Sequence, residues 1–287
     1  MHATVEELEG RVAARLRDAR SACVAVSGGV DSSLVLALAV RTLGPGAVVA
    51  VTAAAPVMVP GEGEAARLLA LRLGAVHVEV AVPLMDEARF VANPRDRCYV
   101  CKAMVLDAVR RVAAERGCAV VLDGANLDDL DDERPGMRAA DERGVRHPLL
   151  EAGLTKRDVR RLARAVGLAA WDAPAQACLA SRIPYGERIS EAALRRVAEA
   201  EQAMRELGFR TCRVRAHGAV ARVEVPRDEI GRAGGAAREE IARRLRALGF
   251  TYVTVDLDGL RSGSMNELPE AGPCGACPPP DVPGVVP

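Results

Sequence analysis

Four short apolar runs alternate with helical segments in the first part of the chain. Each run has the length of a buried strand, and together they occupy residues 22–26, 47–53, 76–80 and 118–123. The segments between them carry helical periodicity at about 32–40, 62–73 and 100–116. Strands alternating with helices of this length predict right-handed βαβ units and a parallel, doubly wound α/β sheet. Such folds bind ligands at the carboxyl ends of their strands.

The pattern changes near residue 175. One long helix at about 191–207 precedes two short strands, 211–215 and 219–225, with a turn at His217-Gly218, and a last strand follows at 251–256. This order predicts a smaller α+β domain. We therefore expect three parts: an α/β domain, an α+β domain and an irregular proline-rich tail, at residues 1–175, 176–268 and 269–287.

Charge and cysteine content restrict the class of protein. The 287 residues include 39 basic and 39 acidic side chains, and this neutral balance argues against a nucleic-acid partner. No signal peptide and no membrane-spanning run is recognisable, so we expect a cytoplasmic protein without a membrane partner. In a reducing compartment, eight cysteines favour metal binding or catalysis over disulfides.

The segment between the first strand and the first helix reads SGGVDSS. Its glycines allow the backbone to approach a phosphate, and the free N–H groups at the helix start face the anion. Asp31 can hold a magnesium ion on phosphate oxygens, and the serines supply hydroxyl donors. Neither a Walker-type loop nor a dinucleotide-binding glycine motif occurs. Including one glycine after the fourth strand, the predicted ATP-binding residues are Ser27, Gly28, Gly29, Val30, Asp31, Ser32, Ser33 and Gly124.

The SGGVDSS segment resembles the PP-loop of the ATP pyrophosphatases. The resemblance implies that ATP is cleaved to AMP and pyrophosphate, with Mg²⁺, to adenylate a carbonyl or carboxylate oxygen. That superfamily includes NAD, GMP and asparagine synthetases and the tRNA thiolation enzymes, and this motif alone does not choose among them.

Further motifs distinguish among the members of this superfamily. The chain reads PAQACLASRIPYGERI at 174–189, DGANLDD at 123–129, RPGMRA at 134–139 and LDGLRSGSMNE at 257–267. In this order they resemble the LarE family, the sulfur transferases of nickel-pincer nucleotide assembly, from the first strand to about Glu267. The resemblance implies a PP-loop domain, adenylation of pyridinium-3,5-biscarboxylic acid mononucleotide and conversion of its carboxylates to thiocarboxylates. It also implies a homo-oligomer, reloaded by a sulfur donor protein or free sulfide.

The family has two sulfur sources. In one subset a cysteine that matches Cys178 gives up its own sulfur and becomes dehydroalanine; in another, three cysteines hold a [4Fe-4S] cluster with a transferable sulfide. This chain also has Cys98 and Cys101 in RCYVCK. Because iron–sulfur centres are normally held by cysteine, we favour a cluster on these three residues over sacrifice of Cys178. A zinc site would need a fourth ligand that we cannot name, and a pair of half-buried thiols is the plain alternative for Cys98 and Cys101.

The resemblance implies further site residues. Lys102 matches a family lysine and can neutralise phosphate or carboxylate charge; Lys156, the only other lysine, is interpreted as a helix-surface residue. Arg213 and Arg215 alternate on one strand, so both point to one face and suit a phosphate. The expected set around the substrate phosphate is Ser181, Arg182, Arg213, Arg215 and the acidic Glu201. We assign no role to Cys274 and Cys277, which lie in the tail.

Three other functions stay open on the sequence. A PP-loop tRNA thiolation enzyme can also use three cysteines and a cluster. An ammonia-dependent amide-forming synthetase would have no need of Cys98, Cys101 or Cys178. An ATP-sensing adaptor or sulfur carrier would bind ATP without releasing pyrophosphate.

Overall fold

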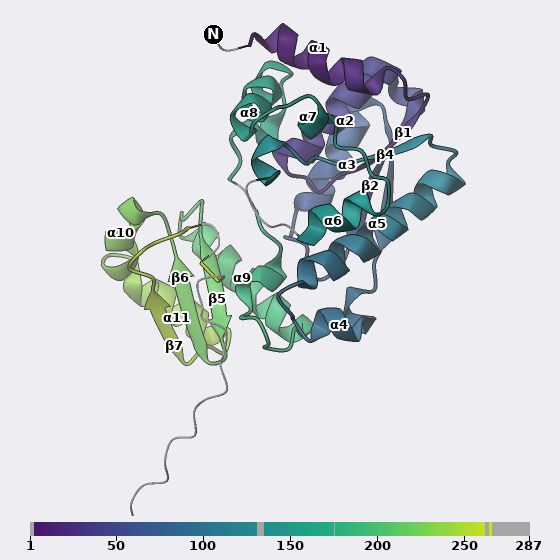
Figure 1. The fold of residues 1–287 in the computed structure, drawn as a ribbon. Coiled ribbons are helices and arrows are strands. Elements are labelled where there is room, and N and C mark those ends of the chain that lie inside the picture. Colours follow the sequence, from purple (N-terminus) through teal and green to yellow (C-terminus); the bar gives the residue numbers. More distant parts are fainter. Residues whose placement is uncertain (1–2, 131–134, 175, 262–263, 266–287) are drawn as a thin grey trace, which may run out of the picture.

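The computed structural model describes residues 3–130, 135–174, 176–261 and 264–265 of the chain. They form a larger lobe around one sheet and a smaller lobe around another (Figure 1). Among the described residues, no helix combines the length and the apolar content needed to cross a bilayer.

The larger sheet has four parallel strands in the order β3-β2-β1-β4. They are β1 (Ala22–Ala25), β2 (Val48–Ala54), β3 (Val76–Ala81) and β4 (Val120–Leu122). The chain adds β2 and β3 on one side of β1 and then places β4 on the other side. The order therefore reverses between β1 and β4, the point at which open α/β sheets form a ligand-binding crevice.

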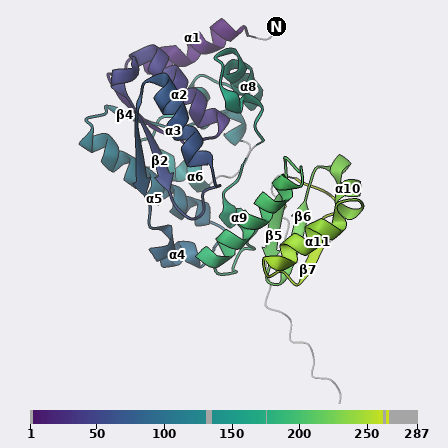
Figure 2. The same ribbon diagram turned by 180° about the vertical axis from the view of Figure 1, so that it is seen from behind.

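Helices cover both faces of this sheet (Figures 1 and 2). One layer packs its apolar side chains with β1 and β2 in the largest core and contains α1 (Val5–Leu16), α2 (Val30–Leu43), α3 (Glu62–Leu73), α7 (Pro148–Glu151) and α8 (Lys156–Ala165). On the opposite face lie α5 (Arg97–Glu115) and α6 (Pro135–Asp141), and Val109 and Val112 of α5 pack on Cys23 and Val51. The predicted doubly wound α/β fold is confirmed.

The smaller lobe is α+β. Its sheet has the order β5-β6-β7, from β5 (Arg213–His217), β6 (Val220–Glu224) and β7 (Tyr252–Val255). β5 and β6 are antiparallel, whereas β7 joins β6 in parallel after α10 (Ile230–Gly234) and α11 (Arg238–Ala247). The long helix α9 (Glu191–Glu206) packs on β5. β5 begins two residues later than the strand predicted at 211–215. The hairpin turn is a two-residue loop that starts at Gly218, where φ is +56°, so the paired residues before the turn are shifted along the chain.

The two lobes share one core. Val57, Phe90 and Val100 of the larger lobe belong to the same buried apolar cluster as Val197 and Val214 of the smaller lobe. The predicted domain limits stay a prediction, since residue 175 and the tail from 269 lie outside the described residues. The cluster continues across the region of the predicted boundary.

A buried asparagine fastens the two lobes where α4 (Ala88–Val91) leads into α5. The side-chain amide of Asn93 donates to the carbonyl oxygens of Ile183, Pro184 and Glu187, at 3.4, 2.7 and 2.9 Å. Its Oδ1 accepts a 2.6 Å hydrogen bond from Arg97, whose guanidinium lies 4.2 Å from the ring centroid of Tyr185. The loop that follows Cys178 is therefore tied to the first turn of α5, which carries Cys98 and Cys101.

Replacing Asn93 tests this connection. Asn93→Ala removes the donor of three carbonyl groups, those of Ile183 and Pro184 in buried hydrogen bonds. It also places Ala at a φ of +58°, where Asn is better tolerated. We expect the free energy of unfolding to fall by about 2–4 kcal/mol, measured by urea denaturation. Asn93→Gly, which relieves only the backbone, should recover a small part of the loss, and full recovery by Gly would contradict the role given to the side chain.

Candidate active site

The predicted phosphate loop connects β1 to α2. Gly28 has a φ of +86°, and a Cβ added there would lie 2.5 Å from the carbonyl oxygen of Glu62, so only glycine fits. Ser32 Oγ accepts a 3.1 Å hydrogen bond from the backbone N–H of Ser27 and donates a 3.3 Å hydrogen bond to the carbonyl oxygen of Gly29. These bonds hold the loop in a closed turn at the carboxyl end of β1, where the first N–H groups of α2 can face an anion.

Gly124, after β4, brings the second predicted segment against the loop. A Cβ at Gly124 would lie 2.6 Å from the backbone nitrogen of Ser32 and 2.9 Å from the carbonyl carbon of Asp31. Asn126 Nδ2 donates to Asp31 Oδ1 at 3.2 Å. The structure therefore brings the predicted loop residues 27–33 and Gly124 together between β1 and β4.

Lys156 belongs to this site, and its interpretation as a surface residue is wrong. It is the first residue of α8, after the capping residue Thr155, and its ammonium group forms an ion pair with Asp31. Its backbone N–H donates to Asp128 Oδ2 at 3.2 Å. The scarcity of lysine was the available sequence signal, since both lysines of the chain pair with an aspartate: Asp123 directly after β4 and Asp31 in the first turn of α2. An ammonium group here can compensate the charge of a triphosphate.

The role of Lys156 in ATP cleavage can be tested by comparison with the next residue, Arg157. We expect Lys156→Ala to slow pyrophosphate release from ATP by about a hundredfold or more, because one donor to the developing charge is lost. Arg157→Ala is the matched control, since Arg157 is exposed on the same helix and should leave the rate unchanged. Radiolabelled or enzyme-coupled pyrophosphate measurement gives both rates; equal rates in the two variants would remove Lys156 from the site.

A buried carboxylate holds the other lysine. Asp123, directly after β4, forms an ion pair with Lys102 Nζ at 2.9 Å and lies 2.5 Å from His147 Nδ1. Burial alone would raise the pKa of Asp123, but the charge of Lys102 and the hydrogen bond of His147 hold it well below its ordinary value. Burial would likewise lower the pKa of His147, yet Asp123 and Asp141 raise it. Lys102 is thereby oriented at the strand edge beside Cys101.

The His147–Asp123 pair makes stability depend on pH. The folded-state pKa of His147 lies above the ordinary 6.5, so its contribution is complete below about pH 6.5 and is lost as the pH rises through the folded value. We expect His147→Asn to lower the melting temperature more at pH 6 than at pH 9. His77, whose pKa burial lowers, is the control: the effect of His77→Asn should not grow towards low pH. Parallel melting curves for the two variants across this range would contradict the ion pair.

The three predicted cysteines lie near one another. Cys98 and Cys101 are one turn apart at the start of α5, and Cys178 directly precedes the 3-10 turn Leu179–Arg182. Burial raises the pKa of the Cys101 thiol to about 12, and the charges of Cys178 and Cys98 act on it in the same direction. Within the described ranges, no three His, Cys, Asp or Glu side chains are placed to hold a single metal ion.

Two of the arginines that are predicted to bind the substrate phosphate are buried and paired with a carboxylate. Arg182 binds Glu201 at 2.7 and 3.1 Å and also donates to the carbonyl of Ala177. Arg215 binds Glu224 at 3.1 and 2.9 Å and donates to the carbonyl of Ser181 at 2.7 Å. Both guanidinium groups therefore hold the turn that carries Cys178 and Ser181.

Arg213 differs from these two. It donates to the carbonyl of Arg261 at 3.3 Å, and burial together with the charges of Arg215 and Arg182 lowers its pKa. The charges of Arg215 and Arg182 reach Arg213, so the three arginines lie in one region. An anion bound there would relieve the repulsion between them.

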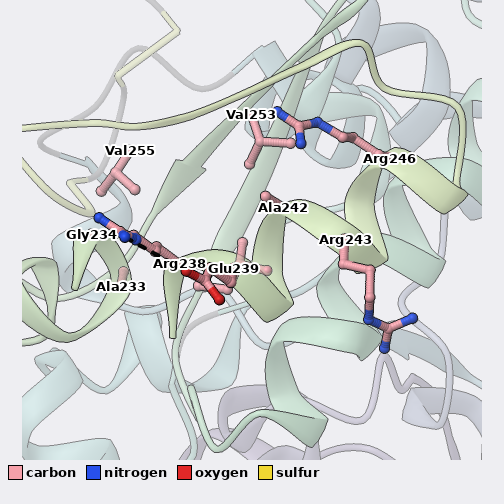
Figure 3. A pocket seen from close by; sticks show the side chains of 10 residues that line it. Ala233, Gly234, Arg238, Glu239, Ala242, Arg243, Arg246, Val253 and Val255 are labelled. Atoms are coloured by element: carbon pink, nitrogen blue, oxygen red, sulfur yellow. Dashed lines mark ion pairs between the residues drawn. The ribbon is translucent and has the colours of Figure 1, made fainter. Parts of the chain in front are cut away.

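A hollow on the smaller lobe lies apart from all of these residues (Figure 3). It has a volume of about 720 Å³ between α10, α11 and β7, with Ala242, Val253 and Val255 among its apolar residues and Arg243 and Arg246 beside them. None of the predicted site residues lines it.

The fold and the loop define the class of protein. Residues 4–207 match the family model described as asparagine synthase, which covers the large sheet and the phosphate loop. The chain is thus a member of the PP-loop enzymes, which use ATP with Mg²⁺.

Comparison with individual proteins identifies the family within the PP-loop enzymes. The chain is 43% identical over 248 residues to an uncharacterized protein of Synechocystis sp., covering 86% of this chain and 92% of that one. It is 39% identical over 265 residues to the pyridinium-3,5-bisthiocarboxylic acid mononucleotide synthase of Lactiplantibacillus plantarum, covering 92% and 96%. The chain belongs to the LarE family of ATP-dependent sulfurtransferases.

Proposed function

We propose that this protein adenylates the carboxylates of pyridinium-3,5-biscarboxylic acid mononucleotide and converts them to thiocarboxylates for the nickel-pincer nucleotide. The observation that carries the proposal is the likeness, over nearly the whole chain, to a protein named as that synthase. The geometry supports it, because the turn after Cys178 is fastened to the phosphate-loop side by the 2.8 Å hydrogen bond from Leu179 N–H to the carbonyl of Val57.

The adenylation step uses the β1–β4 edge. Asp31 is the residue that would hold Mg²⁺ with the phosphates, since a carboxylate is a preferred ligand of this hard cation. With Asp31 holding the metal, the Lys156 ammonium group, which pairs with Asp31, would be able to bind a phosphate oxygen instead. The α2 N–H groups and Lys156 then stabilise the charge that develops on pyrophosphate as the substrate carboxylate attacks the α-phosphorus.

The substrate mononucleotide is held between the lobes in this proposal. Arg213 binds its phosphate, and the Ser181 hydroxyl, which donates to the carbonyl of Cys178 at 2.8 Å, would turn to the phosphate when it binds. Arg182 and Arg215, paired with Glu201 and Glu224, keep the turn in place. Lys102 offsets the charge of the substrate carboxylate. Holding the acyl adenylate near Cys178 makes the following sulfur transfer effectively intramolecular.

Two routes deliver the sulfur. Cys98, Cys101 and Cys178 are the residues that would hold a [4Fe-4S] cluster with one open iron, because such clusters are normally held by cysteine thiolates and Cys101 lies within reach of the charges of the other two. Bound there, the cluster would supply a transferable sulfide. In the other route the Cys178 thiolate attacks the acyl adenylate and AMP leaves; loss of the Cys178 α-proton then breaks its Cβ–S bond, giving the thiocarboxylate and dehydroalanine.

Two further parts of the proposal concern assembly and turnover. We expect the chain to work as a homo-oligomer, and a sulfur donor protein or free sulfide to reload the enzyme. Thiolation of tRNA and ammonia-dependent amide formation are the competing activities, and product analysis separates them from the proposed one.

The decisive experiment is anaerobic purification with iron and sulfide analysis, followed by turnover with ATP and the mononucleotide. About four irons per chain, lost in Cys98→Ala but kept in the control Cys118→Ala, would establish the cluster route. No iron, with loss of one H2S from Cys178 after turnover, would establish sacrifice of that residue. Mass spectrometry should detect the thiocarboxylate in either case; product formed only from tRNA or ammonia would overturn the proposed function.

A further inference from the structure

Arg97 is a buried cation that directly precedes the cysteine pair. It is the first residue of α5, next to Cys98 and one helical turn before Cys101, and only 3% of its surface is exposed. Its guanidinium group donates to Asn93 Oδ1 at 2.6 Å and lies 4.2 Å from the ring centroid of Tyr185. Neither partner carries a negative charge, and burying a cation costs free energy unless an opposite charge compensates it.

No carboxylate among the described residues pairs with this guanidinium group. Asp96, the residue before it, forms an ion pair with Arg89 of α4 instead. Arg97 Nε is buried and has no hydrogen-bond partner in the part of the chain that the structure describes. Lys102, on the other side of the cysteine pair, is already matched by Asp123 at 2.9 Å. Arg97 therefore differs from Lys102, because its charge has no fixed counter-charge in the described structure.

The sulfur atoms are the groups that can supply the missing negative charge. Residues four apart on a helix share one face, which brings Arg97 and Cys101 together. Burial raises the pKa of the Cys101 thiol to about 12, and the charge of Arg97 is among those that act against this rise. Asn93 ties Arg97 to the loop after Cys178, since it also donates to the carbonyl of Pro184 at 2.7 Å. Cys101 and Cys178 in turn contact one buried apolar cluster.

We propose that Arg97 provides the counter-charge of the sulfur centre, stabilising the negative charge of the thiolates of Cys98, Cys101 and Cys178 or of a cluster that they hold. The inference rests on the proposed function, in which this centre carries the sulfur. Arg97 acts through the cysteines and is thus a positioning residue. A guanidinium group suits this place because it keeps its proton when buried. Its field also favours the approach of a small anion such as hydrosulfide, which could reload the centre.

The test compares an anionic with a neutral thiol reagent, iodoacetate and iodoacetamide, on the full chain after a chelator has removed any iron. Both reagents attack the same thiolate, so the ratio of their rates reports the local electrostatic potential and does not depend on the protonation of the thiol. Mass spectrometry of the labelled peptide gives the ratio at Cys98, which is exposed. At low salt, Arg97→Gln should lower the ratio about threefold or more, because one positive charge beside the sulfur is lost.

Two further variants separate charge from structure. Arg97→Lys keeps the charge without the planar fork and should keep most of the wild-type ratio. Arg110→Gln is the matched control and should leave the ratio unchanged, because Arg110 is exposed on the same helix, about 20 Å further along.

An unchanged ratio in Arg97→Gln, or an equal fall in Arg97→Lys, would overturn the inference and leave Arg97 only its structural tie to Asn93. If Arg97→Gln does not fold, Arg97→Met gives the same comparison, since an apolar residue of similar size often replaces a buried charge without loss of stability. The labelling needs neither ATP, the mononucleotide nor iron. A wild type that forms no thiocarboxylate would therefore remove the proposed function without changing the ratio, so the two failures are distinguishable.

Discussion

The close backbone approach around the phosphate loop is the constraint on which the rest of this structure depends. Gly28 packs against the first residue of α3, and Gly124 packs against the first residues of α2, at distances that leave no room for a side chain. These two contacts bring the loop, the end of β4 and the start of α3 to one point. Asp31 and Asp123 consequently lie at the same edge of the sheet, although they are far apart in the sequence.

Ion pairs then keep the charged groups of the site in order. Four carboxylates of the site each pair with a cation: Asp31 with Lys156, Asp123 with Lys102, Glu201 with Arg182 and Glu224 with Arg215. Because removing a charge from water is expensive, a pair in such a place must be well matched, and its members have few alternative positions. The result is a set of preoriented cations at a site that, in the proposed reaction, receives a triphosphate and a carboxylate.

The sulfur site depends on contacts between the lobes. Asn93 and Arg97 fasten the loop after Cys178 to the start of α5, and the shared apolar core supports that junction. The three cysteines therefore approach each other through contacts made by other residues of the two lobes. This arrangement explains why the smaller lobe cannot be regarded as an independent addition to the PP-loop fold.

Local patterns in the sequence were sufficient for the parallel sheet, the phosphate loop and the family, because apolar periodicity and short motifs are properties of neighbouring residues. The same patterns misplaced β5 by two residues and assigned Lys156 to the surface, and they gave no sign of Asn93 or His147. Those residues act through partners distant in the chain and through loss of hydration, and both are decided only when the helices and the two lobes pack. The sequence by itself determined which chemistry to look for; the tertiary structure decided which carboxylates are paired with which cations, because these partners meet only when the helices and the two lobes pack.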